Sequence, residues 1–418
     1  MTVELPEGWD GSRLESILET TIVGVWGRDA RSDEVDVDVL RVTELKANGL
    51  LEPSTAARRS VSAKQVASRS LKVGDIILEK SGGGPKSPVG RVGHITKSTE
   101  GFLFSNFMQL LRPDSSQVIP NYLFQFLVYF QATGQTSPMQ TATTNIRNIK
   151  MPDYLAIAVP KPPLPEQERI VEILEEQFSR LDSALASVKA VREKAKAFRR
   201  SLLHSAFSGE LTGGTEGWRE VALGEIAKWG SGGTPKGKNP KFYGGEIPWA
   251  IIGDLNDGVI NETAEKITQE GLDNSSAKWV PENSVLIAMY GSIGKLGINA
   301  IPLTTNQAIA FAVPDEALTL TKYLYFVLMN ERQRLVKEGK GATQQNISQT
   351  ILKPWQIPLP PLAEQERIVE ILEEQFSRLD NALEVANQLE ARIAAERRSL
   401  LHSAFTGELT AKWRATHV

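Results

Sequence analysis

The chemistry-bearing residues of this chain do not combine into a catalytic motif. Residues 232–238 match the phosphate-binding pattern G-x-x-x-x-G-K, but Asn239 replaces the magnesium-binding Ser or Thr that should follow, and Pro240 interrupts the required helix. Four histidines and no cysteine argue against a zinc site. Asp153 lacks the Glu-x-Lys companion that a nuclease would need. We therefore expect no catalytic site, no metal and no cofactor on the chain itself.

One short segment leaves an enzymatic alternative open. Residues 239–242 read Asn-Pro-Lys-Phe, close to the Asn-Pro-Pro-aromatic signature of amino-methyltransferases but with lysine at the third position. No glycine-rich cofactor motif precedes this segment. An intrinsically active DNA methyltransferase thus remains an alternative, which binding of S-adenosylmethionine by the purified chain would support.

Basic and polar residues in loops suit DNA recognition better. Arg and Lys pair with guanine, and Asn and Gln pair with adenine. Such residues occur in glycine-containing loops at 81–93, 231–241 and 291–297, and in polar stretches at 141–148 and 344–347. Each also has a structural alternative, either solvation or capping of a turn. The predicted DNA-binding residues are Lys86, Arg91, Asn145, Arg147, Lys236, Lys238, Lys295, Gln344, Gln345 and Asn346.

The overall charge hides local basic stretches. The chain carries a net charge of −3, yet between Arg41 and Lys97 eleven Lys and Arg face four Asp and Glu, and residues 231–241 hold three lysines and no acid. Such stretches could approach phosphates. The absence of cysteine fits a reducing cytoplasm. No stretch approaches eighteen apolar residues, so we predict no membrane span.

An internal repeat positions these loops. Residues 166–182 and 364–380 are identical, EQERIVEILEEQFSRLD, and residues 199–207 and 397–405 repeat at the same offset of 198. Proline-rich runs precede both copies, and Gly209 and Gly407 follow them, which is typical of the two ends of a helix. The repeat predicts two long helices, each preceded by a globular part.

The apolar residues of the two helices follow a coiled-coil pattern. They recur three and four residues apart from Val171 to Leu202 and from Val369 to Leu400, with the same short step at Val191 and at Leu389. A shared seam with a shared irregularity indicates that the two helices pair with each other. If a two-fold axis relates the two halves, the helices run antiparallel and the tail after Gly407 reaches the first globular part.

Both globular parts read as mixed α/β structure in the same order. The first has expected strands at 71–80, 102–112 and 154–159, a helix at 121–130 and a polar loop at 141–148. The second has expected strands at 280–290 and 308–313 and a helix at 322–336. Asn306 is expected to correspond to Asn106, and residues 344–347 to residues 143–146. Gly217-Trp218 corresponds to Gly8-Trp9. A shared frame with different loops predicts two readers of different DNA sequences.

The predicted divisions are residues 1–160, a first globular part; 161–212, the central helix; 213–358, a second globular part; and 359–418, the C-terminal helix and tail. At about 1.5 Å per residue, helices of this length would hold the two readers about one turn of DNA or more apart. The expected target is therefore a bipartite, asymmetric site with an unread spacer.

The order of these parts resembles the specificity subunit of type I restriction-modification systems. The resemblance covers essentially the whole chain and is carried by both Pro-Pro-Leu-x-Glu-Gln-Glu-Arg-Ile segments, beginning at Pro162 and Pro360, by the Gly-Glu-Leu-Thr segments at Gly209 and Gly407, and by the Pro6-Glu7-Gly8-Trp9 opening. It implies two α/β target-recognition domains and an antiparallel coiled coil with internal pseudo-two-fold symmetry.

The resemblance also implies the partners. A specificity subunit is a non-catalytic reader of double-stranded DNA whose helices dock two methyltransferase subunits, through which restriction subunits join the complex. S-adenosylmethionine, ATP and magnesium are then expected on the partner subunits. An autonomous DNA-binding regulator is the remaining alternative, and it would bind its site tightly without any methyltransferase.

Overall fold

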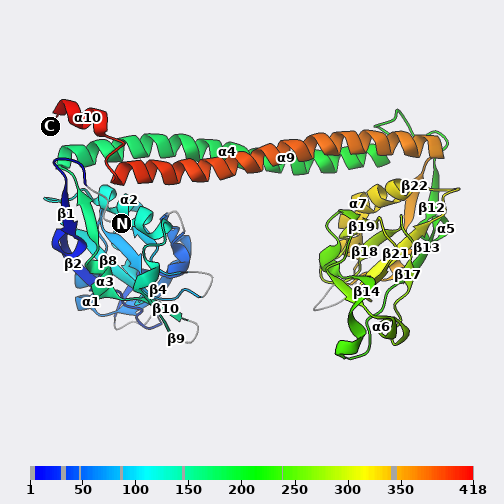
Figure 1. Cartoon of the computed structure of the whole chain (residues 1–418), viewed down its shortest axis with the longest axis horizontal. Helices are drawn as coiled ribbons and strands as arrows, with labels where there is room; N and C mark the ends of the chain where they lie inside the picture. The colour runs from blue at the N-terminus through cyan, green and yellow to red at the C-terminus, as the bar shows by residue number, and fades with distance from the viewer. Residues whose placement is uncertain are drawn as a thin grey trace. The chain divides into compact units, whose positions relative to one another are not determined.

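The fold was analysed in a computed structural model that describes residues 5–29, 34–46, 49–84, 88–143, 146–237, 239–339 and 346–417. The chain divides into two compact units (Figure 1). Unit 1 comprises Met1–Val188 with Gln388–Val418, and unit 2 comprises Lys189–Asn387. Each unit thus combines a globular part with segments of both long helices. The predicted divisions at residues 160, 212 and 358 separate consecutive ranges of the chain, whereas each unit combines segments from different ranges. Those divisions stay predictions.

Two sheets form the frame of unit 1 in the described residues. One is antiparallel in the order β2-β8-β5-β6, and the other has the order β4-β3-β7, with β3 and β7 parallel. The strands are β1 (Asp10–Arg13), β2 (Leu18–Val23), β3 (Val35–Leu40), β4 (Ala57–Val61), β5 (Ile76–Glu79), β6 (Val92–His94), β7 (Leu103–Phe104), β8 (Met108–Pro113), β9 (Gln140–Thr143), β10 (Ile146–Ile149) and β11 (Ala158–Lys161). The helices are α1 (Ala63–Arg69), α2 (Pro120–Ala132) and α3 (Met151–Leu155), with 3-10 turns η1 (Leu14–Ile17), η2 (Val42–Glu44), η3 (Pro53–Thr55), η4 (Lys97–Thr99) and η5 (Ser137–Met139).

Unit 2 repeats this frame with additional strands. Its two larger described sheets have the orders β13-β21-β18-β19-β15 and β16-β14-β20-β17, and β12 pairs with β22. The strands are β12 (Arg219–Ala222), β13 (Ala227–Ser231), β14 (Tyr243–Ala250), β15 (Gly258–Ile260), β16 (Glu265–Ile267), β17 (Trp279–Val280), β18 (Val285–Ala288), β19 (Leu296–Asn299), β20 (Leu303–Thr305), β21 (Ile309–Pro314) and β22 (Gln356–Leu359). The helices are α5 (Leu223–Ile226), α6 (Gln269–Asp273), α7 (Thr321–Glu338) and α8 (Gln349–Leu352), with η6 (Pro240–Phe242) and η7 (Ile252–Asp254).

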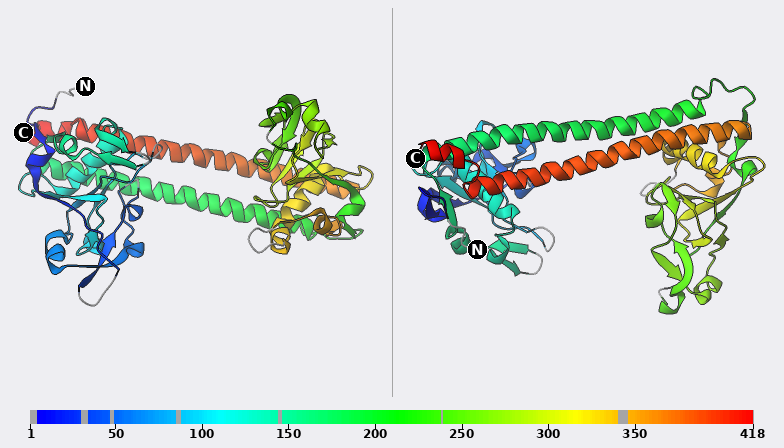
Figure 2. Two further views of the ribbon diagram at one scale, coloured as in Figure 1. Left: turned by 90° about the horizontal axis from the view of Figure 1, so that it is seen from below. Right: turned by 45° about the horizontal axis from the view of Figure 1, so that its top comes forward.

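The two long helices are α4 (Leu164–Phe207) and α9 (Leu362–Phe405), and a short helix α10 (Ala411–His417) follows. In unit 1, the early residue Asp182 of α4 binds the late residue Arg397 of α9 at 2.7 Å. In unit 2, the late residue Arg199 of α4 binds the early residue Asp380 of α9. Within each unit the helix segments therefore run antiparallel, side by side in both views (Figure 2), which confirms the predicted pairing.

The predicted apolar seam is only partly correct. Leu174, Val188 and Ala195 of α4 are buried, but Val191 and Phe198 are 43% and 49% exposed, and Leu389, where the pattern slips in α9, is also exposed. Arginine side chains supply part of the contact between the two long helices. The Arg199 guanidinium lies 4.6 Å from the Phe376 ring centre in unit 2, and Arg397 lies 4.4 Å from that of Phe178 in unit 1. These arginines cover aromatic surface while binding carboxylates, so fewer aliphatic residues are needed.

The Glu-Gln-Glu segment of each repeat joins a long helix to its globular part. In unit 1, the buried Gln167 accepts a hydrogen bond from the Ile119 amide at 2.8 Å and donates to the Pro162 carbonyl at 2.9 Å. In unit 2, Gln365 accepts from Leu320 at 3.0 Å and donates to Pro360 at 2.9 Å. Both side chains satisfy backbone groups beside the starts of α2 and α7, where a helix leaves amides unpaired. The repeated motif is therefore a structural clamp.

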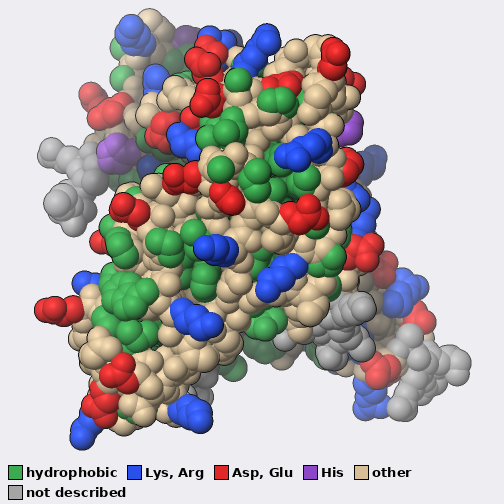
Figure 3. Space-filling view, turned by 90° about the vertical axis from the view of Figure 1, so that its right-hand side faces the viewer, with side chains coloured by type: hydrophobic (Ala, Val, Ile, Leu, Met, Phe, Trp, Pro, Cys, Tyr) green, Lys and Arg blue, Asp and Glu red, His purple; other side chains and the backbone are tan. Residues whose placement is uncertain are grey.

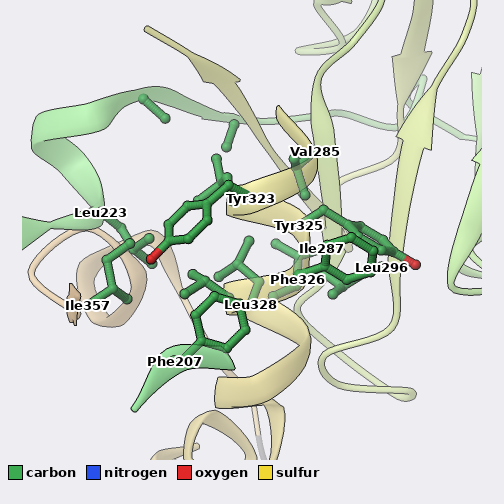
Figure 4. Packing of buried hydrophobic residues seen from close by; sticks show 14 of the residues in the cluster. Phe207, Leu223, Val285, Ile287, Leu296, Tyr323, Tyr325, Phe326, Leu328 and Ile357 are labelled. Atoms are coloured by element: carbon green, nitrogen blue, oxygen red, sulfur yellow. The ribbon is translucent and has the colours of Figure 1, made fainter. Parts of the chain in front are cut away.

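The cores lie between the sheets and the helices. In unit 2, Phe207 at the end of α4, Tyr323 of α7 and Ile357 of β22 enclose one apolar cluster (Figure 4). In unit 1, Tyr122 and Phe405 occupy a comparable place, with ring centres 5.5 Å apart. The Tyr122 and Tyr323 hydroxyls donate to the carbonyls of Pro160 and Pro358. The same aromatic contact thus ties each globular part to the repeat.

Several predicted elements differ in detail. The expected polar loop at 141–148 lies on a hairpin, because β9 pairs with β10 through Thr143 opposite Ile146. The expected strand at 154–159 is split into α3 and β11. Thr and Asn are compatible with both loops and strands, so only the pairing of backbone groups decides between the two.

Candidate nucleic-acid interface

Backbone hydrogen bonds show which residues of the two units correspond. The Phe104 carbonyl accepts from Val25, and the Thr305 carbonyl accepts from Gly233. The same pattern joins Gly24 to Met108 and Gly232 to Ile309. Side chains on Gly24 or Gly232 would collide with the carbonyls of Ser105 or Thr305. Glycine is therefore required in both units, where two backbone segments approach closely.

This correspondence corrects two sequence alignments. Since Met108 matches Ile309, Asn306 corresponds to Ser105 and not to Asn106. Since Ile149 donates to Lys80 at 2.8 Å and Ile347 donates to Met289 at 3.1 Å, Asn346 corresponds to Asn148 and not to Asn145. Both errors amount to shifts along the chain, which sequence letters cannot fix in regions where the units share few residues.

Half of the predicted DNA-binding residues have described positions. Lys86, Asn145, Lys238, Gln344 and Gln345 lie outside the described residues. The structure places the other five on two units, so it does not join them in one site: Arg91 and Arg147 in unit 1, and Lys236, Lys295 and Asn346 in unit 2. Their role in DNA binding stays a prediction.

Arg91 has a structural partner. Its Nε and Nη2 donate to the two carboxylate oxygens of the buried Glu79 at 2.7 and 2.8 Å, and its Nη1 donates to the Leu45 carbonyl at 2.6 Å. The hydrogen bond to Glu79 raises the pKa of Arg91, against the opposing effect of burial. A guanidinium held in this way neutralises a buried carboxylate, and removing it would leave Glu79 unpaired. This geometry favours the structural alternative for Arg91.

Arg147 is presented differently. It lies on β10, where its amide donates to the Gly83 carbonyl at 3.1 Å and its carbonyl accepts from Gly82 at 3.1 Å. In the described part of unit 1, no carboxylate forms an ion pair with its half-buried side chain. Lys80, at the end of β5, likewise has no described ion-pair partner. Both cations are available to an external anion.

In unit 2, Lys236 is exposed on the glycine-containing loop, and Lys295 is half-buried beside Gly294. Among the described residues neither lysine has an ion-pair partner. The Asn346 side-chain oxygen is buried and accepts no hydrogen bond from a described group. Asn346 is therefore not shown to present this oxygen to a base, and its role stays a prediction.

The surface is less basic than the sequence suggests. Arg41 binds Glu44, Lys46 binds Glu52, and two more arginines bind aspartates that precede the basic stretch, Arg58 with Asp38 and Arg59 with Asp29. On the face shown in Figure 3, Lys and Arg are interspersed with Asp and Glu. On this face the figure shows no broad basic patch, and the local loops stay the candidates for contact with phosphates.

Sequence reasoning missed the exposed aromatic residues. Phe107 is 41% exposed at the turn before β8, and Trp279 is 50% exposed on β17 beside the exposed Lys278. Phe107 was hidden in an expected continuous strand at 102–112, although Ser105-Asn106 within it is typical of a turn. Trp279 lies on an extra strand of unit 2.

Comparison with known proteins shows to which family this chain belongs. Residues 6–188 and 215–394 match the family described as the type I restriction modification DNA specificity domain. The chain belongs to this family. As a type I specificity subunit, it is of the non-catalytic kind of subunit in such complexes. The described residues contain no group of three His, Cys, Asp or Glu that could hold a metal, and no described helix is long and apolar enough to span a membrane.

One relative matches nearly the full length of the chain, and a second matches about half of it. The specificity subunit is 28% identical to the StySPI specificity subunit of Salmonella potsdam, over 99% of this chain and 91% of the relative. It is 33% identical to the EcoR124I/EcoR124II specificity subunit of Escherichia coli over 54% and 57%.

Two solved structures share the fold. One, from work on assembly and conformational transition of the type I R-M system, has a TM-score of 0.76 at 20% identity and covers 96% of this chain and 98% of that chain. The HsdS subunit from Thermoanaerobacter tengcongensis has a TM-score of 0.56 at 19% identity and covers 98% and 99%.

Proposed function

We propose that this specificity subunit reads an asymmetric, bipartite site in duplex DNA, one half-site per unit. The observation that carries the proposal is a common backbone frame with different side chains at corresponding loop positions. Lys80 and Ser81 of unit 1 correspond to Met289 and Tyr290 of unit 2, for example. Because base contacts specify sequence while the frame fixes the position of the reader, two such units read different bases.

The long helices are the proposed docking surface for two methyltransferase subunits. Their exposed apolar side chains support this assignment: Val191, Phe198 and Val385 in unit 2 and Leu389 in unit 1. Exposed large apolar side chains on otherwise polar helices are typical of protein interfaces. Restriction subunits join through the assembled complex. Since the genome is the substrate, the site of action is the cytoplasm.

The partners supply the chemistry in this proposal. S-adenosylmethionine belongs to the methyltransferase subunits, and ATP and magnesium belong to the restriction subunits. The specificity subunit itself then has no catalytic site. Purified alone, it is expected to show no saturable binding of S-adenosylmethionine in calorimetry, and such binding would favour an intrinsic methyltransferase.

Mapping methylated positions tests the proposed function. The chain is co-expressed with its methyltransferase subunits in a host that lacks other modification enzymes, and the host genome is then sequenced for methylated bases. We expect one motif with two unequal specific parts and a fixed unspecific spacer. Methylation at a continuous or palindromic motif would contradict reading by two dissimilar units, and tight binding of one site without any methyltransferase would favour an autonomous regulator.

A further inference from the structure

Unit 1 exposes an aromatic side chain at the edge where β5 ends and β8 begins. Phe107 is 41% exposed there, whereas its counterpart in unit 2, Ala308, is 8% exposed. The backbone is the same in both places, because the Phe107 carbonyl accepts from the Lys80 amide at 3.0 Å and the Ala308 carbonyl accepts from the Met289 amide at 2.7 Å. The frame does not need a large side chain at this position.

Backbone hydrogen bonds hold Phe107 beside the β9-β10 hairpin. Its carbonyl also accepts from the Ser81 amide at 3.2 Å, and its ring lies 3.8 Å from the place where a side chain on Gly82 would begin. Gly82 in turn donates to Arg147 of β10, and the Ser81 hydroxyl donates to the Asn148 side chain at 2.6 Å. These contacts place the exposed ring next to the hairpin.

The surroundings of Phe107 carry positive charge. Lys80 and Arg147 have no ion-pair partner among the described residues, while the nearby carboxylate of Glu79 is buried and neutralised by Arg91. An exposed apolar ring on the same edge as two cations that lack a described ion-pair partner suits an anionic partner that displays a small apolar group. Duplex DNA displays one such group in its major groove, the C5 methyl of thymine.

The shape of this edge suits the same groove. The major groove admits a two-stranded β-ribbon, and β9 with β10 is such a ribbon. We propose that Phe107 contacts the C5 methyl of one thymine in the half-site read by unit 1, with Lys80 and Arg147 on adjacent phosphates. Phe107 is thus a specificity-determining residue of unit 1. The inference rests on the proposed function, since it assumes that unit 1 reads DNA.

Replacing thymine by uracil tests this contact, because uracil lacks only the methyl group. Binding of the complex of this chain with its methyltransferase subunits is measured on site-containing duplexes, each with one thymine replaced. Burial of one methyl group contributes about 0.8 kcal/mol, so one replacement should weaken binding about 4-fold. The Phe107→Ala complex should bind the thymine and uracil duplexes equally well.

A matched control is Val73→Ala, which shortens an exposed apolar side chain before the other end of β5. It should retain the 4-fold preference. A wild-type complex that selects its site but is indifferent to every uracil would overturn the inference, even if Phe107→Ala failed to fold. Persistent sensitivity to uracil in Phe107→Ala would overturn it as well. A complex that binds site-containing duplexes no more tightly than a duplex without the site would instead contradict the proposed function, and the inference with it.

Discussion

At the scale of single residues, the most informative pair is Gln167 and Gln365. Both are fully buried, and each binds two carbonyls and one amide of the adjoining segments. The motif that identifies the family in the sequence therefore maintains the connection between a long helix and its globular part. Phe107 and Ala308, which occupy the same place in the two units, differ in size and exposure, so the shared frame does not fix the side chain there.

We expect Gln365→Ala to destabilise unit 2. The substitution leaves the Leu320 amide and two carbonyls without their partner, and an unsatisfied buried group costs about 1–3 kcal/mol. Urea unfolding followed by circular dichroism measures the loss. The control is Glu366→Ala at the next, exposed position, which should change stability by less than about 0.5 kcal/mol. Equal effects of the two substitutions would show that the clamp does not matter.

His94 makes a second prediction. Its ring stacks on Phe124 with ring centres 5.4 Å apart, and burial lowers its pKa, partly opposed by the charge of Asp75. Because the unfolded chain then binds a proton at a higher pH than the folded chain does, stability falls as the pH drops below the ordinary histidine value of about 6.5.

Hydrogen exchange of β6 tests this pH dependence. In wild type, protection of the β6 amides should decrease between pH 7 and pH 5 after correction for intrinsic exchange rates. His94→Gln should flatten that decrease, whereas His204→Gln, at an exposed histidine of unit 2, should not alter it. An unchanged slope in His94→Gln would refute a role for this ring.

Single side chains were the hardest part to predict from sequence. Arg91 was selected for its loop and charge, but its orientation toward Glu79 depends on β5 and β6 lying side by side. Phe107 was overlooked because its exposure depends on a turn between β7 and β8. In both cases the deciding contact joins residues that sequence spacing does not bring together.

At the scale of elements, the long helices were the easiest to predict. A repeated apolar pattern without internal Pro or Gly predicts α4 and α9 directly. Their seam was overestimated, because Phe198 fits the pattern and is nevertheless exposed, as are Val191 and Leu389, where the pattern slips. The spacing of apolar residues alone does not show whether they pack against the other helix or bind another subunit.

Two substitutions to glutamate on α4 separate these roles. Ala195→Glu places a charge in the buried seam and should destabilise the helix pair by about 2 kcal/mol or more. Phe198→Glu changes an exposed position and should leave thermal unfolding nearly unchanged, but it should weaken binding of the methyltransferase subunit at least 10-fold. Thermal unfolding and calorimetric titration are the measurements. Wild-type affinity in Phe198→Glu would remove Phe198 from the docking surface.

At the scale of the whole molecule, the N-terminal and C-terminal regions of the chain both contact the start of α4 in unit 1. The Trp9 indole donates to Glu166 at 2.9 Å, and Thr410 donates to the same carboxylate at 2.7 Å. In unit 2, the Thr212 hydroxyl donates to the Glu364 carboxylate at 2.7 Å. The segment that follows α4 supplies this contact in unit 2, whereas the C-terminal tail supplies the equivalent contact in unit 1. These contacts confirm that the tail reaches the first globular part, as the repeat predicts.

The spacer of the DNA site should follow the length of the helices. Inserting one heptad into both α4 and α9 would lengthen each helix by about 10 Å, or about three base pairs at roughly 3.4 Å each. Mapping of methylated positions should then show unchanged half-sites with a spacer about three base pairs longer. An unchanged spacer would show that the helices do not set the distance.

The most direct test exchanges one reader. Residues 1–160 are replaced by the corresponding segment of a family member with a known, different target, and the methylated motif of the hybrid complex is sequenced. We expect one half-site to change to that of the donor while the other half-site stays as in wild type. A hybrid that methylates a motif changed in both halves, or in neither, would contradict the reading of DNA by two independent units.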